Sequence, residues 1–455
     1  KKYLDLVPKG QLLVETAQDY YDFVSYPGRG YIVLNLQYLS DNNWIREFNV
    51  IGANKTLDVV HFTGDTVENR VNLISSSNFY SRAYLYISRW NTIISQVDEA
   101  RGEESIRVLA KAEAKVFRAF DYFHLINTYA KAYHPGTAAT DGGVPMMYTY
   151  DLEATPKKGT VKEAYDLIQK DLDEAIPHLQ ATPKDPYHPS LAFAWALKAK
   201  VHLFKREWSE AKDAALKSLS YNDKLIDLVD LSAKGGPTVV NTPAAANPEV
   251  LSLMFVQGYN EMNFAWQWLI SPELVQLFGT NDARYNLFFR NTNGSYMDLG
   301  SGAAYWQSTF TQFFYPTVGM KTGDVYLILA EAYARENNIS GAMDYLNRLR
   351  KKRILDATAE IPVPATAQEA MQYIITERRK ELLFGFNRFF DLKRYNLDPE
   401  YAKTIERKFP VVNQTVPQQT YTIKPNSRLY VIPFPADVLK LNRALTLNTD
   451  ETIPF

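Results

Sequence analysis

The sequence predicts a mainly α-helical protein, in which a tetratricopeptide-like helix-turn-helix scaffold stands beside a loop-rich part with minor β content. Three observations support this fold class. Apolar residues recur with helical spacing in long stretches, a helix-turn-helix unit occurs twice at a fixed offset, and the region between the two copies loses its helical period.

The first half of the chain contains segments with the spacing of amphipathic helices. Thr160 followed three residues later by Glu163 is a capping-box signature, which predicts that a helix begins there. Residues 190–219 read as two antiparallel helices with a short turn at "KREWS". In residues 104–133 one apolar stripe indicates a long helix, and it consists of Leu109, Ala112, Val116, Phe120, Phe123 and Ile126.

One helix-turn-helix unit is repeated along the chain. Residues 199–211, "AKVHLFKREWSEA", align with residues 330–342, "AEAYARENNISGA", at an offset of 131. Both copies place small alanines where two helices would cross closely, followed by a polar turn. This pattern is typical of tetratricopeptide-like repeats. Because the two units are not contiguous, we expect an interrupted array rather than a plain solenoid.

The interruption lies between about residues 222 and 320. Residues 249–256, "EVLSLMFV", predict a short strand, and residues 291–319 mix Gly, Asn and aromatic residues without a helical period. Near the C-terminus, residues 418–442 predict a further strand and a helix after Pro435.

Composition excludes several classes of site. Lys and Arg total 50 and Asp and Glu total 51, so the chain lacks the basic excess of a nucleic-acid-binding protein. Cysteine is absent, which excludes disulfides and thiolate metal sites, and the six histidines include no i,i+4 pair. No cofactor is predicted; scattered Asp and Asn are compatible with a structural calcium ion but form no recognisable loop. No apolar run reaches the roughly 20 residues of a membrane span.

Residues 377–396, "ERRKELLFGFNRFFDLKRYN", combine six cations, three acids and four phenylalanines. An anion-binding patch would leave its cations unpaired and exposed, whereas here acids and rings alternate with the cations. We therefore interpret the segment as scaffold with buried, paired charges. It should contain the end of one helix, a terminating Gly385 and a second short helix with Asn387 as its cap. Arg378→Ala should accordingly reduce stability rather than ligand binding, because it would strand buried Glu partners.

The segment 377–395 also resembles the C-terminal signature of the SusD/RagB family, outer-membrane nutrient-binding lipoproteins of Bacteroidetes. Gly385 stands one position further from Arg388 than is usual in the family. Other family-like pieces follow in the family's order: "YLDLVPKGQLLVETAQDYYDFV" (3–24), "YLSDNNW" (38–44), "FYSRAYLYISRWNTIISQVDEA" (79–100), "AEAKVFRAFDYFHLINTYAKAY" (112–133), "GGVPMM" (142–147), "DVYLILAEAYAREN" (324–337) and "RLYVIPFPADVLKLN" (428–442).

The resemblance implies one SusD-like domain over residues 1–455. It implies a helical scaffold mainly in residues 10–220 and 320–396, an irregular ligand-facing insertion at about 222–320, and a C-terminal loop and helix segment at 397–455. It further implies a non-catalytic, surface-exposed lipoprotein of the outer membrane that binds a glycan and passes it to a SusC-like TonB-dependent transporter. The lipid anchor would be a cysteine just ahead of Lys1.

Sugar rings present apolar faces that stack on Trp and Tyr, while Asn and Arg bond the hydroxyls. Two stretches combine these residue types in loop-like sequence, and there we expect surface display of the rings. Trp266 and Trp268, at i,i+2, would face opposite sides of a strand, so at most one should reach ligand. Trp90, Trp195 and Trp208 lie in periodic helices and should be core or helix-contact residues. The candidate ligand-binding residues are Asn43, Trp44, Trp266, Trp268, Arg290, Tyr296, Tyr305 and Trp306.

Two alternative functions remain open from the sequence. An α-helical glycoside hydrolase would need two carboxylates flanking the sugar, for which Asp41, Asp282 and Asp298 are candidates. No nucleophile elbow, phosphate loop or HExxH motif accompanies them. A protein-interaction scaffold without glycan affinity is the second alternative, since tetratricopeptide-like repeats often have that role.

Overall fold

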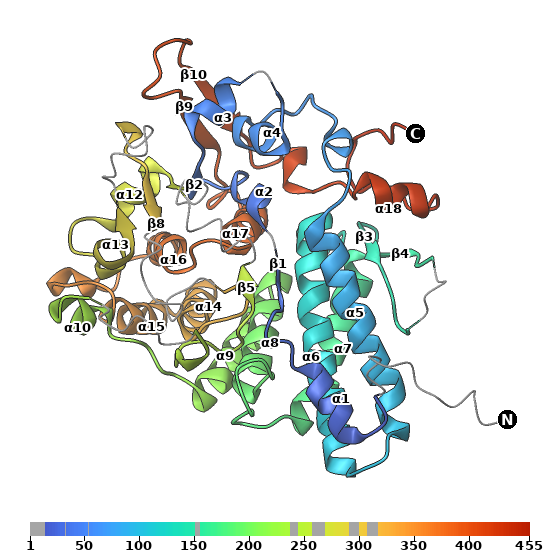
Figure 1. Cartoon of the computed structure of the whole chain (residues 1–455). Helices are drawn as coiled ribbons and strands as arrows, with labels where there is room; N and C mark the ends of the chain where they lie inside the picture. Colours follow the sequence, from blue (N-terminus) through green and yellow to red (C-terminus); the bar gives the residue numbers. More distant parts are fainter. Residues whose placement is uncertain are drawn as a thin grey trace.

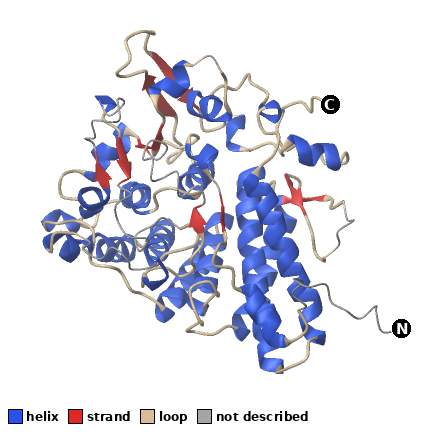
Figure 2. Cartoon of the chain, in the orientation of Figure 1, coloured by secondary structure: helices blue, strands red, loops and turns tan. Residues whose placement is uncertain are grey.

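The computed structural model describes residues 14–31, 33–52, 54–150, 155–236, 244–256, 269–290, 300–306 and 317–455. Helices make up most of the molecule, and the strands of these ranges form four small sheets (Figures 1 and 2). The fold is mainly α-helical with minor β content, as predicted.

The long helices of the first half form a bundle on one side of the molecule (Figure 1). Its members are α1 (Ala17–Val24), α5 (Asn78–Gln96), α6 (Glu104–Tyr129) and α7 (Val161–Ala175). The predicted capping box is present, because Thr160 and Glu163 each bond the other's backbone N–H, at 3.1 and 2.7 Å. Trp90 is fully buried in this core, as predicted.

The predicted repeat is confirmed as two helical hairpins. They are α8 (Leu191–Lys205) with α9 (Trp208–Tyr221), and α14 (Thr322–Arg335) with α15 (Ile339–Arg350). Each hairpin turns through a left-handed non-glycine residue, Arg206 (φ 69°) in the first and Asn337 (φ 62°) in the second, and these two positions are equivalent in the repeat. Helix α14 packs against α9, so the two hairpins adjoin although 100 residues separate them in sequence.

Shorter helices and strands surround this scaffold. Within the strand predicted at residues 249–256, only the last two residues form a strand, β5 (Phe255–Val256). In its described residues, the interruption also contains three short α-helices that the sequence did not predict. The short helices are α2 (Leu34–Gln37), α3 (Glu47–Ile51), α4 (Leu57–Thr63), α10 (Leu228–Ala233), α12 (Pro272–Phe278), α13 (Ala283–Phe288) and α18 (Ala436–Leu441). The 3-10 turns are η1 (Arg70–Asn72), η2 (Val97–Glu99), η3 (Ile176–His178), η4 (Ala244–Ala246), η7 (Ala357–Ala359) and η8 (Arg428–Tyr430).

Two of the sheets pair strands from distant parts of the chain, and the other two pair strands that are close in sequence. The orders are β1-β5, β3-β4, β9-β10 and β2-β6-β8-β7. The predicted C-terminal strand is β10, and its partner β9 was not predicted. The strands are β1 (Gly30–Tyr31), β2 (Asn43–Trp44), β3 (Gly142–Pro145), β4 (Lys158–Thr160), β5 (Phe255–Val256), β6 (Leu269–Ile270), β7 (Phe289–Arg290), β8 (Ala304–Trp306), β9 (Ile405–Phe409) and β10 (Gln419–Ile423).

The charged segment 377–396 is scaffold, as predicted. It contains the end of α16 (Ala367–Glu381) and all of α17 (Asn387–Tyr395). All six cations are buried, with 2 to 8% of each residue exposed. The predicted cap is wrong, because Asn387 is the first helical residue and Phe386 precedes it as the cap.

The turn between α16 and α17 places two consecutive residues in the left-handed region, Phe384 (φ 64°) and Gly385 (φ 67°). Arg378 bonds Asp391 at 2.8 Å and lies 3.4 Å from Asp324. Its partners are therefore aspartates rather than the glutamates expected from the sequence.

Candidate functional site

The four-stranded sheet brings together candidate residues that lie far apart in the sequence. Trp44 on β2 pairs with Leu269 on β6, Leu269 pairs with Tyr305 on β8, and Tyr305 pairs with Arg290 on β7. One row across the sheet therefore contains three of the predicted ligand-binding residues. Trp266 and Trp268, just ahead of β6, and Tyr296, after β7, lie outside the described residues.

The two faces of this sheet pack against different cores. Trp44, Leu269 and Tyr305 pack with Phe62 and Phe409 of α4 and β9. The alternate residues Ile270, Ala304 and Trp306 face the main helical core. Neighbouring residues of a strand point to opposite faces, so Tyr305 and Trp306 cannot share a surface.

Trp44 is buried, with 5% of the residue exposed, so the expected surface display of its ring is wrong. The ring meets Phe62 edge-on at a centroid distance of 5.4 Å and Phe409 at 5.6 Å. These contacts arise because α4 and the unpredicted strand β9 cover this face of the sheet. The indole Nε1 of Trp44 has no hydrogen-bond partner among the described residues.

Tyr305 and Trp306 are also buried, with 9% and 5% exposed, which corrects the expectation of display beside "GSGAA". Trp306 stacks on Phe288 at 5.1 Å and meets Phe289 edge-on at 5.4 Å. Its Nε1 likewise lacks a hydrogen-bond partner within the described ranges. Trp306 is therefore a core residue of the face opposite to Trp44.

Asn43 is buried and holds the loop that precedes β2. Its Nδ2 donates to Gln37 at 3.1 Å, and its Oδ1 accepts from the Ser40 hydroxyl at 3.2 Å. Asn43 thus positions the neighbouring Trp44 through local hydrogen bonds. For Arg290 the structure places the backbone, at the end of β7 and opposite Tyr305.

A pocket of about 220 Å³ lies beside Trp44. Ser271 and Glu273 at the start of α12 line one side, and residues 405–408 of β9 line the other. The Glu273 side chain is 47% exposed, so its carboxylate is reachable from solvent. The pocket therefore combines a buried aromatic ring with reachable polar groups.

Asp41 also lines this pocket, and its carboxylate is paired with several cations. Arg388 donates two hydrogen bonds to its carboxylate, at 2.7 and 2.9 Å, and Lys403 lies at 2.9 Å. Burial alone would raise the pKa of Asp41, but Arg388 and Arg379 hold that pKa well below its usual value. The carboxylate is therefore ionised, and both its oxygens are already engaged.

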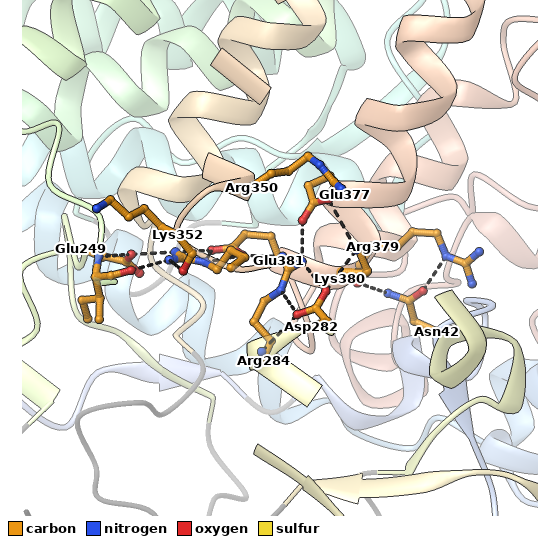
Figure 3. A network of polar contacts seen from close by, with 12 residues as sticks. Asn42, Glu249, Asp282, Arg284, Arg350, Lys352, Glu377, Arg379, Lys380 and Glu381 are labelled. Atoms are coloured by element: carbon orange, nitrogen blue, oxygen red, sulfur yellow. Dashed lines mark hydrogen bonds and ion pairs between the residues drawn. The ribbon is translucent and has the colours of Figure 1, made fainter. Parts of the chain in front are cut away.

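A second group of charges connects α16 to α13 and α15 (Figure 3). Arg284 bonds Asp282 at 2.7 Å, Glu377 at 2.5 Å and Glu381 at 2.8 Å. Arg353 joins Glu381 to Glu249, at 2.8 and 2.7 Å. Burial opposes ionisation of Glu381, but Arg353 and Arg284 lower its pKa to about 2. This network supports the sheet from the scaffold side.

The carboxylates that a hydrolase would use are not arranged for that chemistry. A general acid needs a raised pKa, whereas Asp41 is held ionised by three cations. Asp282 is fully buried and bound by Arg284 and Lys380. Asp298 lies outside the described residues.

Two further kinds of feature are absent from the described residues. No group of three or more His, Asp or Glu side chains in that part of the chain is placed to hold a metal ion. None of its helices has the length and apolar character that crossing a bilayer requires.

Sequence reasoning missed the residues that line the far side of the pocket. Glu406, Arg407 and Lys408 lie on β9, whose residues alternate between buried and exposed. The sequence "IERKF" gives no apolar period of two, because the middle inward residue is the charged Arg407. Glu273 was missed as well, because the short helix α12 has too few residues to show a helical period.

Comparison with known proteins gives family matches over most of the chain. A model described as the SusD family matches residues 271–450, and one described as starch-binding associating with outer membrane matches residues 34–203. SusD-like protein P2 of Formosa agariphila is 25% identical over 82% of this chain and 80% of its own length.

Solved structures have the same fold. A SusD superfamily protein of Bacteroides thetaiotaomicron matches with a TM-score of 0.74 at 18% identity, over 95% of this chain and 99% of its own. A SusD-like carbohydrate binding protein of Bacteroides vulgatus matches with a TM-score of 0.69 at 18% identity, over 97% and 99%. With these matches and the repeat, sheet and signature segment described above, the chain belongs to the SusD/RagB family of non-catalytic binding proteins.

Proposed function

We propose that this protein binds a glycan at the outer-membrane surface, with one sugar unit in the pocket beside Trp44. The observation that carries the proposal is the unpartnered indole N–H of Trp44 next to a polar pocket. A buried donor without an acceptor is costly, and a sugar hydroxyl could supply the acceptor after a small side-chain shift. Membership of a family whose matching model is described as starch-binding supports the same ligand class.

The pocket has room for one ring rather than for a chain. At about 220 Å³ it is smaller than a typical drug-sized ligand site, so the other units of an oligosaccharide would lie outside it. The Oε2 of Glu273 would accept from a hydroxyl, because its Oε1 already accepts from Arg379 and Lys403. The Ser271 hydroxyl donates to the Asp41 carbonyl and could only accept, and Trp44 would supply its N–H. Tyr305 is buried in the core and is not among the proposed contacts. The other candidates, Arg290, Trp266, Trp268 and Tyr296, belong to the same sheet row or to the segments next to its strands, and we propose them as contacts for the outer units.

We further propose that bound glycan passes to a SusC-like TonB-dependent transporter and that an N-terminal lipid holds the protein to the outer membrane. The family resemblance supports both parts of this proposal, together with the outer-membrane association in the description of the model that matches residues 34–203. A pull-down of the transporter from outer-membrane extracts with the lipidated protein tests it.

Isothermal titration against a panel of gluco-, xylo- and manno-oligosaccharides tests glycan binding. Trp44→Phe keeps an aromatic ring between Phe62 and Phe409 but removes the N–H, so affinity should fall about 3- to 10-fold. Trp306→Phe is the matched control, because it removes an equally unpartnered indole N–H on the opposite face and should leave affinity unchanged. Trp44→Ala should weaken binding by about 1–3 kcal/mol.

No heat with any glycan, together with tight transporter binding, would favour the interaction scaffold instead. Release of shorter oligosaccharides during prolonged incubation would contradict the non-catalytic function. Equal loss of affinity in Trp44→Phe and Trp306→Phe would show that the sugar does not bind specifically beside Trp44.

A further inference from the structure

A second and larger cavity lies at the C-terminal end of α17. It has a volume of about 590 Å³, within the usual range of small-molecule sites, and shares no lining residue with the pocket beside Trp44. Four separate segments form its wall, namely residues 131–141 after α6, the end of α17, residues 425–431, and residues 448–450.

Polar atoms without hydrogen bonds gather around this cavity. Among the described residues, the Tyr430 hydroxyl, the Asn396 Nδ2, the Thr449 hydroxyl and the Arg428 Nε are all buried without a hydrogen-bond partner, and all four residues line the wall. Asn396 lies close enough to Tyr430 to act on its pKa, but the two groups form no hydrogen bond of normal geometry. Tyr430 itself is only 5% exposed. Buried polar groups are normally paired, so this concentration indicates a wall built for a hydrogen-bonding ligand.

The charges of the wall leave one cation without an ionic partner. Lys131 pairs with Asp141 at 2.9 Å, and Arg428 pairs with Asp450 at 3.0 Å. Lys393, only 6% exposed, has no carboxylate partner in the described part of the chain, and burial lowers its pKa to about 7, a shift that a bound carboxylate would oppose. Its ammonium donates to the carbonyls of Asn127 and Ala130 at the end of α6, which leaves its third N–H for another acceptor.

The geometry points to a binding site for a small hydroxylated carboxylate, such as an acidic monosaccharide. The carboxylate would pair with Lys393, since an ammonium without a counter-ion is the strongest anion partner that the wall offers. The hydroxyls would bond Tyr430, Asn396 and Thr449. This site is independent of the glycan pocket proposed above, because the two cavities have different walls.

Isothermal titration with D-glucuronate tests the inference, with D-glucose and acetate as matched probes. Glucose keeps the hydroxyls but lacks the carboxylate, and acetate has the carboxylate alone. Glucuronate should bind at least about tenfold more tightly than either, because only it satisfies both kinds of partner. Equal affinity for glucuronate and glucose would overturn the assignment of Lys393, and absence of glucuronate binding would overturn the site.

Variants separate the site from general effects on folding. Tyr430→Phe and Thr449→Val remove hydroxyls that make no hydrogen bond in the protein, so both should keep the wild-type melting temperature and weaken glucuronate about 3- to 10-fold. Lys393→Met should abolish the preference for glucuronate over glucose; if it fails to fold, the two hydroxyl variants still decide. Trp44→Phe should leave glucuronate binding unchanged. Unchanged affinity in both hydroxyl variants, or loss in Trp44→Phe, would contradict the proposal.

Discussion

In the bundle around α6 the buried charges form separate pairs, whereas around α16 and α17 they form a connected network. Arg118 of α6 bonds Asp171 of α7 through two hydrogen bonds of 2.7 Å, and no other ion pair involves either residue among those described. Arg284, by contrast, bonds three carboxylates, and each of these bonds a further cation. The same interaction type is thus used in two arrangements within one fold.

The difference shows which part of the molecule depends on contacts between residues that lie far apart in the sequence. The bundle is held mainly by apolar packing between helices adjacent in sequence, so a single buried pair can be exchanged for apolar residues. The Arg284 network joins α13, α15 and α16. A separate cluster joins Asp41 to α12, α16 and α17, and its Arg388 lies 347 residues from Asp41 in sequence. Because Asp41 lines the pocket beside Trp44, this second cluster orders the candidate site as well as the scaffold.

The largest expected effect comes from Arg284→Leu. This change takes one cation from three buried carboxylates at once and leaves the network one positive charge short, so the free energy of unfolding should fall by about 5 kcal/mol, the upper end for a broken buried pair. Urea unfolding at neutral pH measures it. Arg348→Leu is the matched control, because its pair with Asp344 is about half exposed and its loss should cost less than about 1 kcal/mol. A loss below about 2 kcal/mol for Arg284→Leu would show that the network relaxes around the missing cation.

The helical scaffold could be predicted because its signals are local. The capping box at Thr160, the apolar stripes and the repeated turn all act within about ten residues, and each appears where the sequence placed it. The cap predicted at Asn387 is the exception. The repeat offset even predicts the equivalence of Arg206 and Asn337, although the left-handed conformation of two non-glycine residues was not foreseen.

The site could be predicted only in part, because its environment comes from distant segments. The sequence correctly selected residues that meet on one sheet row, since Trp44, Tyr305 and Arg290 are aligned there. It could not show that Phe62 and Phe409 cover that row, because strand β9 is short and highly charged. A charged segment such as 377–396 was easier to interpret, since alternating acids, cations and rings already indicated internal pairing.

A smaller effect is expected for Arg118→Leu in the bundle. Asp171 is 1% exposed and would lose its cation, so the loss should be about 3 kcal/mol at pH 8. Burial already raises the pKa of Asp171, so the loss should shrink as the pH falls and the carboxyl becomes neutral. The double variant Arg118→Leu/Asp171→Leu should recover most of the stability, which no single second change can do for Arg284. If the double variant is no more stable than Arg118→Leu, the buried pair cannot be exchanged for apolar residues, and the proposed difference between the two regions is wrong.

The smallest expected effect is a pH slope that has opposite signs in the two regions. Burial raises the pKa of Glu113 on α6 to about 7, although its bond to His188 opposes the shift. The folded state then binds more protons than the unfolded state between about pH 4.5 and 7, so this group's contribution to stability declines as the pH rises through that window. Glu381 has its pKa lowered to about 2, so its contribution to stability is lost as the pH falls from about 4.5 to 2.

Thermal unfolding of wild type and Glu113→Gln between pH 4.5 and 7 isolates the contribution of Glu113. The difference between the two proteins should change by up to about 1.4 kcal/mol per pH unit, with wild type gaining toward acid. A constant difference across the window would mean that Glu113 remains ionised beside His188, and the bundle would then contain a charged pair there rather than a neutral carboxyl.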